Sequence, residues 1–281
     1  MKYVDKNKNL KKLQKIELEM LKYFDEICHK HNLEYFLAYG TLIGAVRHQG
    51  FIPWDDDIDI YMKGQDYIKL VDILKDNKNK KYFFQSLETE KNYYLLWNKI
   101  RINNTVLIEK GWENIKVHKG ISLDIFPLFD YPEDNSTYKK IARKYKISRL
   151  LIENNISPNG FYKSYGKFGK ILSKILKLVP HSIRNKIVQK NVNYFANYSL
   201  NSSSYFSTDR GLIRKMNKND FDKSILLKFE DKRFSCPSGY DHLLKGIYGN
   251  YMELPKEEDR VGHGEVYLCF NTKDDTNEQK K

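Results

Sequence analysis

Two aspartates separated by one residue, Asp57 and Asp59, are the strongest indication of chemistry in this chain. They lie in residues 55–60, which are predicted to form a strand, and side chains on a strand alternate between its faces. The two carboxylates therefore share one face, while Ile58 and Ile60 share the other and can be buried. Carboxylates held together repel each other unless a cation or a proton lies between them, and oxygen ligands favour a hard cation. The pattern predicts a site for Mg²⁺ or Mn²⁺, and the simpler alternative is a solvated acidic turn.

The segment before this strand is suited to binding phosphate. An apolar run over residues 35–39 leads into Gly40 and Thr41 and then into a short helix that is expected to end near Arg47. Gly40 allows a sharp backbone turn, and Thr41 is predicted to be the N-cap of the helix. A helix N-terminus beside a pair of carboxylates is a place where a phosphate group can bind.

Later predicted strands carry three more charged residues of interest. Lys99 and Arg101 lie two residues apart in a strand over residues 95–101, so they are expected to share a face and either bind phosphate or protect a solvated strand edge. Asp124 lies in an apolar strand that Pro127 is predicted to end. An isolated acid in such a strand is costly to bury unless it is paired or binds a metal. The alternative for Asp124 is a strand-end acid that meets solvent or an arginine.

The order of these elements resembles a known active site. A strand, a Gly-Thr turn, a helix and an Asp-x-Asp strand are the organisation of the nucleotidyltransferase site, which residues 36–62 resemble. The string GTLIGAVRHQGFIPWDDDID, residues 40–59, is similar to the signature of the LicD family of phosphotransferases, which are related to the fukutin-related proteins. The resemblance continues through WNKIRINNTVLI, residues 97–108, and returns in residues 229–260. It implies an α/β fold with a nucleotidyltransferase-like mixed β-sheet flanked by helices.

The resemblance also implies a reaction. An alcohol phosphate, phosphocholine first among them, would move from a CDP-linked donor such as CDP-choline to a sugar hydroxyl of a cell-surface glycan precursor, with release of CMP. The acceptor would belong to teichoic acid, capsule or lipopolysaccharide, and is expected to be lipid-linked. Asp57 and Asp59 would bind the divalent metal, and Asp124 would complete the metal site or accept the proton of the acceptor hydroxyl. Asp55 is the alternative base.

The same resemblance assigns residues to the donor. Those expected to hold its diphosphate are Gly40, Thr41, Arg47, Lys99 and Arg101. A quaternary ammonium group would also need an aromatic cage, and Trp54 is the aromatic residue nearest to the site in sequence.

The composition is that of a folded protein without a membrane span. The 281 residues are 41% hydrophobic and 14% aromatic, which excludes general disorder. Three widely spaced cysteines indicate reduced thiols and a cytoplasmic protein. We see neither an apolar signal segment nor a run of about 18 apolar residues, so any membrane contact is expected to be peripheral, at the inner face.

Positive charge is concentrated in the middle of the chain. Residues 138–199 contain fourteen Lys or Arg and one acid, which accounts for the whole formal charge of +13. Residues 167–179 have the pattern of a basic amphipathic helix, which fits either an anionic membrane surface or packing on the protein itself. Nucleic acid is not an expected partner because no recognition motif accompanies the charge.

These patterns predict four parts of the chain: a nucleotidyltransferase-like catalytic core, a basic helical insertion, a C-terminal part that packs on the core and a disordered tail, residues 1–133, 134–200, 201–270 and 271–281. Two other functions remain open from the sequence. An Asp-x-Asp glycosyltransferase would explain the carboxylates but not the Gly-Thr helix before them. A non-catalytic anion-binding module would not need Asp57, Asp59 and Asp124 together.

Overall fold

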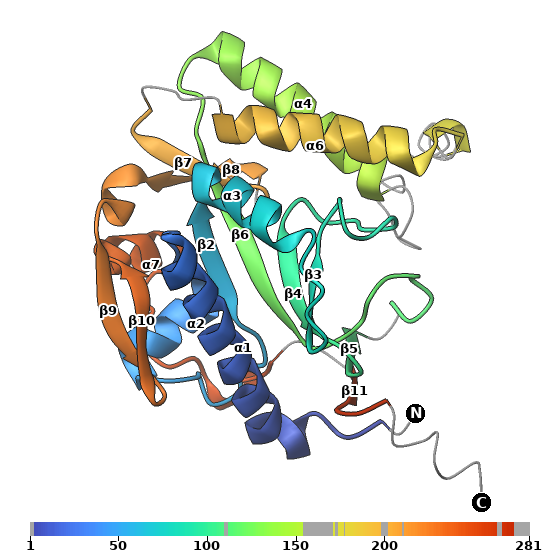
Figure 1. Cartoon of the computed structure of the whole chain (residues 1–281). Coiled ribbons are helices and arrows are strands. Elements are labelled where there is room, and N and C mark those ends of the chain that lie inside the picture. The colour runs from blue at the N-terminus through green and yellow to red at the C-terminus, as the bar shows by residue number, and fades with distance from the viewer. Residues whose placement is uncertain are drawn as a thin grey trace, which may run out of the picture.

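A computed structural model describes residues 3–109, 112–153, 171, 174–176, 178–197, 202–209, 211–262 and 266–272. In this part of the chain the centre is a mixed seven-stranded sheet of order β1-β2-β6-β4-β3, to which β7 and β8 are added beside β6 (Figure 1). This architecture confirms the predicted α/β class with flanking helices. The strands of the sheet are β1 (Phe36–Leu37), β2 (Asp59–Lys63), β3 (Tyr82–Gln85), β4 (Asn98–Ile102), β6 (Ser122–Asp130), β7 (Ser204–Ser207) and β8 (Gly211–Asn217).

Strand β6 organises the sheet. One edge of it pairs in parallel with β2, and the other edge pairs first with β4, up to Ile125, and then with β7, from Leu128 onward. The prediction that Pro127 ends this strand is therefore wrong. The N–H of Asp124 donates to Ile58 on the β2 side, so by alternation position 127 faces the other edge, between the end of the β4 pairing and the start of the β7 pairing. The missing N–H of proline removes no ladder hydrogen bond there.

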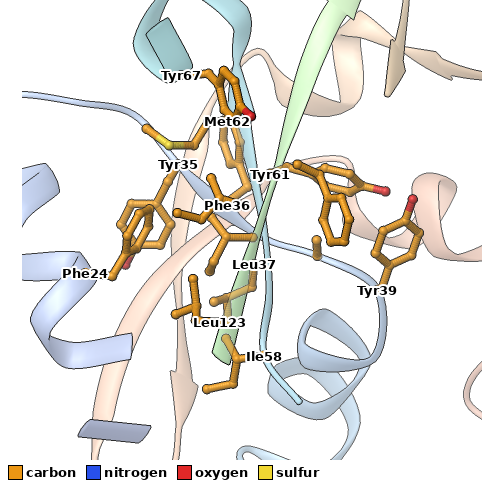
Figure 2. Packing of buried hydrophobic residues seen from close by; sticks show 14 of the residues in the cluster. Phe24, Tyr35, Phe36, Leu37, Tyr39, Ile58, Tyr61, Met62, Tyr67 and Leu123 are labelled. Carbon is orange, nitrogen blue, oxygen red and sulfur yellow. The ribbon is translucent and has the colours of Figure 1, made fainter. Parts of the chain in front are cut away.

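Two helices, α1 (Leu10–His31) and α3 (Gly64–Leu74), cover one face of the sheet. Phe24 of α1 and Tyr67 of α3 are buried there with Met62 of β2, whereas Tyr61 points to the opposite face, where Tyr39 lies (Figure 2). Alternation along β2 thus divides an apolar face under the helices from a face that carries the polar residues of the site.

The predicted helical segment after residue 138 contains α4 (Asn135–Glu153) and α6 (His181–Asn197), which lie side by side at the top of Figure 1. Asn191 of α6 bonds to the hydroxyl of Ser148 and to the backbone of Lys144, both on α4. Phe195 of α6 contacts Phe129 of β6. The helical pair is therefore fixed to the far end of β6. The predicted amphipathic helix 167–179 lies mostly outside the described residues.

The remaining elements surround this core. Two short antiparallel pairs join β9 to β10 and β5 to β11. Among the described residues, no helix has both the length and the apolar character that crossing a bilayer requires. The remaining strands are β5 (Val106–Glu109), β9 (Ser224–Phe229), β10 (Lys232–Pro237) and β11 (Val266–Cys269), and the remaining helices are α2 (Tyr39–Ile43), α7 (Tyr240–Tyr248), the π-helix η2 (Gly44–His48) and the 3-10 helices η1 (Asn7–Asn9), η4 (Lys218–Phe221) and η5 (Glu257–Asp259).

The Phe129 ring should be essential to the junction between the helical pair and the sheet. Phe129 is 1% exposed and contacts Phe195 of α6 and Phe206 of β7. Phe129→Ala is expected to lower the free energy of unfolding by about 3–5 kcal/mol, because truncation of a buried ring leaves a cavity. Urea denaturation would measure this loss, with Leu226→Ala, at a 57% exposed residue, as a control that changes stability by under about 0.5 kcal/mol. A loss below about 1 kcal/mol for Phe129→Ala would contradict this role.

Candidate active site

The predicted carboxylates meet in one cavity. It has a volume of about 530 Å³ and contains all four expected aspartates together with Gly40. Sequence reasoning did not identify its other lining residues, among them four aromatic side chains and a fifth aspartate. The complete lining is Tyr39, Gly40, Asp55, Asp57, Asp59, Trp97, Asp124, Phe126, Asp209, Tyr248, Val261 and Gly262.

Strand pairing places two of the carboxylates side by side. Asp59, the first residue of β2, lies directly opposite Asp124 in the parallel register, and Asp124 lies opposite Lys99 in the antiparallel register with β4. Asp59, Asp124 and Lys99 therefore form one row across three strands. The Nζ atom of Lys99 lies 2.7 Å from Oδ1 and 2.8 Å from Oδ2 of Asp124. The Nε1–H of Trp97 also donates to Oδ2 of Asp124, at 3.0 Å.

The predicted strand over residues 55–60 is only partly correct, because β2 begins at Asp59. Residues 55–57 form a loop in which the N–H of Asp55 donates to the carbonyl of Ile52. Gln14 of α1 donates to the carbonyls of Ile52 and Asp55, at 3.3 and 2.9 Å. These backbone groups thus find partners in the loop and in a helix side chain instead of a neighbouring strand. Asp55 and Asp57 reach the cavity from this loop and not by strand alternation.

The prediction that Thr41 caps a helix is wrong. Helix α2 begins at Tyr39, and Thr41 is buried within it. Its hydroxyl accepts the N–H of Asp59 at 2.9 Å, where the chain has just left β1 at Ala38 and offers no further strand partner. Thr41 therefore helps to start β2 at the first aspartate of the row.

Gly40 is required for a close approach of the backbone to a carboxylate. A Cβ atom at this position would lie 2.6 Å from Oδ2 of Asp55, closer than van der Waals contact permits. The α2 backbone can thus touch the wall of the cavity at a point where any other residue would displace Asp55.

Of the six residues expected to bind the donor, Gly40 lines the cavity and five do not: Thr41, Arg47, Trp54, Lys99 and Arg101. Arg101 is buried and donates to the side chain of Gln85 and, at 2.5 Å, to the carbonyl of Gly120. The Nη1 group of Arg47 donates to the carbonyls of Tyr251 and Glu253. Trp54 has its ring 5.6 Å from the guanidinium of Arg260. These long side chains meet partners from distant segments, which no local pattern reveals.

Comparisons with known proteins point to one family. A family model described as "LicD/FKTN/FKRP, nucleotidyltransferase domain" matches residues 32–168. The lipopolysaccharide cholinephosphotransferase LicD of Haemophilus influenzae is 29% identical over 266 residues, which cover 92% of this chain and 97% of that protein. The chain is therefore similar to proteins of the LicD family along almost its whole length. It is accordingly a phosphotransferase.

Two uncharacterized proteins are similar to a shorter part of this chain. One, from Rickettsia typhi, is 31% identical over 173 residues, which are 58% of this chain and 49% of the relative. The other, from Rickettsia prowazekii, is 30% identical over 173 residues, which are 59% of this chain and 58% of the relative.

Several carboxylates influence one another at the cavity. Burial raises the pKa of Asp59 well above its ordinary value, and the charges of Asp57, Asp124 and Asp55 raise it further, while Lys99 opposes them. Asp56, in contrast, points to Lys6, whose Nζ atom lies 2.6 Å from Oδ2. Asp56 is thus directed away from the carboxylates that line the cavity.

The donor set fits Mg²⁺ without forming a closed cage. Among the described residues, no three His, Cys, Asp or Glu side chains form a group that could hold a metal ion by themselves. Asp124, expected as a third ligand, is engaged by Lys99. Mg²⁺ is commonly bound by only one or two carboxylates, with water and substrate phosphates as the other ligands. Asp57 and Asp59 are the side chains that match this requirement.

Glu17 of α1 is buried near the loop of residues 55–57. It is 1% exposed, and neither of its carboxylate oxygens has a hydrogen-bond partner among the described residues. Burial raises its pKa well above the ordinary value, and the charges of Asp57, Asp56 and Asp55 act in the same direction against Lys6. Ionisation of Glu17 therefore opposes folding.

The free energy of unfolding should fall with rising pH because of the buried Glu17 carboxyl. Because folding raises the pKa of Glu17, its contribution to stability is complete below the unfolded pKa of about 4.3 and is lost as the pH rises through the folded pKa. Glu17→Gln cannot ionise, so its free energy of unfolding should exceed that of the wild type at about pH 8 and approach it at about pH 4. Denaturation at both pH values would measure this, with Glu19→Gln, on the exposed side of α1, as the control. A variant less stable than wild type at about pH 8 would contradict the argument.

Proposed function

We propose that this chain transfers phosphocholine from CDP-choline to a sugar hydroxyl of a cell-surface glycan precursor, with a divalent metal. The observation that carries the proposal is the joining of Asp55, Asp57, Asp59 and Asp124 in one cavity. The Haemophilus influenzae relative is a lipopolysaccharide cholinephosphotransferase that aligns along 92% of this chain. Its activity supports phosphocholine as the transferred group and a cell-surface glycan as the acceptor.

The proposed step is a displacement at the phosphorus that carries choline. The acceptor oxygen forms a new bond to this phosphorus, the bond to the bridging oxygen breaks, CMP leaves with that oxygen, and the hydroxyl proton passes to a carboxylate. Asp57 and Asp59 would hold Mg²⁺ or Mn²⁺, which when bound neutralises the charge of the diphosphate. Lys99 holds Asp124 by two short contacts, so Asp55 is the stronger candidate for the proton acceptor.

Release of CMP tests the reaction directly. Purified protein with Mg²⁺ or Mn²⁺ and a glycan acceptor is expected to release CMP from CDP-choline, and a chelator should abolish the release. Asp57→Asn should reduce the rate at least about a hundredfold, because it removes a charged ligand from the diphosphate site. Asp72→Asn, a matched change on the exposed side of α3, should retain the wild-type rate.

The contrary results are equally informative. CMP release by Asp57→Asn at the wild-type rate would remove the proposed role of this aspartate. Release from CDP-glycerol or CDP-ribitol but not from CDP-choline would replace the donor. Turnover of a nucleotide sugar alone would favour the glycosyltransferase alternative.

The helical pair supports a lipid-linked acceptor at an anionic membrane surface. Helix α6 exposes Ile183, Lys186, Ile187 and Lys190, whose spacing of three and four residues places them on one helix face. Helix α4 repeats the combination in its exposed residues Lys139, Arg143, Lys146 and Ile147. Exposed isoleucines beside lysines suit a surface of anionic head groups above acyl chains.

Vesicle binding tests this surface. Lys186→Gln combined with Lys190→Gln should weaken binding to phosphatidylglycerol vesicles by about 2 kcal/mol, roughly thirtyfold, since each lysine near such a surface contributes about 1 kcal/mol. Lys11→Gln combined with Lys15→Gln is a matched control, because these exposed lysines have the same four-residue spacing on α1. Equal binding by both double variants in a sedimentation assay would exclude α6 from the membrane contact.

A further inference from the structure

The cavity has an aromatic side that the phosphate chemistry leaves unused. The rings of Trp97 and Phe126 lie 5.3 Å apart, and Tyr39 meets Phe126 edge to face, 5.5 Å between centroids at 89°. Tyr248 of α7 lines the same cavity. Three rings from three different segments thus form one continuous wall beside the carboxylates, which we call the aromatic wall (Tyr39, Trp97 and Phe126).

The aromatic wall is the next row of the sheet face after the charged row. Phe126 follows Asp124 by two residues on β6, and Trp97 lies directly before β4, two residues before Lys99. Residues two apart on a strand share a face and lie about 7 Å apart along it. A ligand with its phosphate at the charged row can therefore place a group one short link away against these rings.

Asp209 supplies a negative charge to this side of the cavity. Its Oδ2 atom accepts the hydroxyl of Tyr39, and its carboxylate is part of the cavity lining. The preceding residue, Thr208, is buried and is held twice, by its hydroxyl on the carbonyl of Leu96 at 2.7 Å and by the hydroxyl of Tyr145 on its own carbonyl at 2.9 Å. The chain that carries Asp209 is thus fixed before any ligand binds.

The rings are fixed as well. Donation from Nε1 of Trp97 to Asp124 holds the indole plane. Tyr39 has a φ of 44°, in the left-handed region that non-glycine residues rarely adopt, and Figure 2 shows its ring on the Tyr61 side of β2. Strained conformations of this kind persist where the surrounding structure determines them and are concentrated at binding sites.

We propose that the aromatic wall and Asp209 form the subsite for the trimethylammonium group of the donor. A quaternary ammonium group has no N–H to donate and is recognised by aromatic faces and a nearby negative charge. A glycerol or ribitol chain would instead need hydrogen-bonding partners for its hydroxyls, which ring faces do not provide. The subsite accounts for selection of choline over other alcohols. This inference rests on the proposed function. It replaces Trp54, the aromatic residue nearest in sequence, with Trp97.

Donor kinetics test the subsite. Asp209→Asn should raise the KM for CDP-choline about tenfold and change kcat by under about twofold, since it removes an attraction equal in ground and transition states. The KM for CDP-glycerol should not rise. Asp222→Asn, at an exposed carboxylate outside the cavity, should leave both donors unaffected. An unchanged KM for CDP-choline in Asp209→Asn would overturn the proposal.

Binding of choline chloride separates this proposal from the proposed reaction. By calorimetry, the wild type and Asp57→Asn should bind choline equally, while Asp209→Asn and Phe126→Leu should bind it about tenfold and severalfold more weakly. Choline binding with this pattern but no release of CMP from CDP-choline would support the subsite and refute the reaction. Equal choline binding by wild type and Asp209→Asn, or no binding by the wild type, would refute the subsite even if CMP is released.

Discussion

The row Asp59, Asp124 and Lys99 is the constraint on which the rest of the structure depends. Parallel pairing of β2 with β6 forces two carboxylates into adjacent positions, and antiparallel pairing with β4 brings one ammonium group against them. The charges of Asp57, Asp124 and Asp55 act against ionisation of Asp59, and Lys99 acts in its favour. The strands must therefore be held together by other means, which the isoleucines and aromatic residues under α1 and α3 provide.

The parts of the site that could be predicted are those that the motif and the acids of apolar segments reveal. Asp57, Asp59 and Asp124 were found because each is an acid in or beside an apolar strand, a costly arrangement without a purpose. Their meeting in one cavity follows from the parallel pairing of β2 with β6, which connects strands that are far apart in the sequence. The α/β class with a mixed sheet was implied by the LicD resemblance.

The remaining features depend on partners that are distant in sequence. Arg47 and Arg101 have long side chains whose ends reach backbone carbonyls of other segments. Thr41 looks like a helix cap locally, yet its hydroxyl replaces a missing strand partner of Asp59. Asp209 comes from a segment with no motif, and it reaches the cavity because β7 pairs with the far half of β6. Trp97 lay within the recognised string, and only the register with β6 distinguishes it from Trp54.

On one edge of β6, the pairing with β4 ends before Pro127 and the pairing with β7 begins after it. Pro127 therefore divides β6 into two halves with different neighbours on this edge. The first half faces β4 and carries Asp124, and the second half faces β7 and carries the contacts to the helical pair. The helices enter and leave the sheet on the second half alone. Evolution or an engineer could therefore exchange the helical pair for another module, keeping the Phe129 contact, without altering the register that aligns the charged row. The helical pair and the charged row would then be inherited as independent traits.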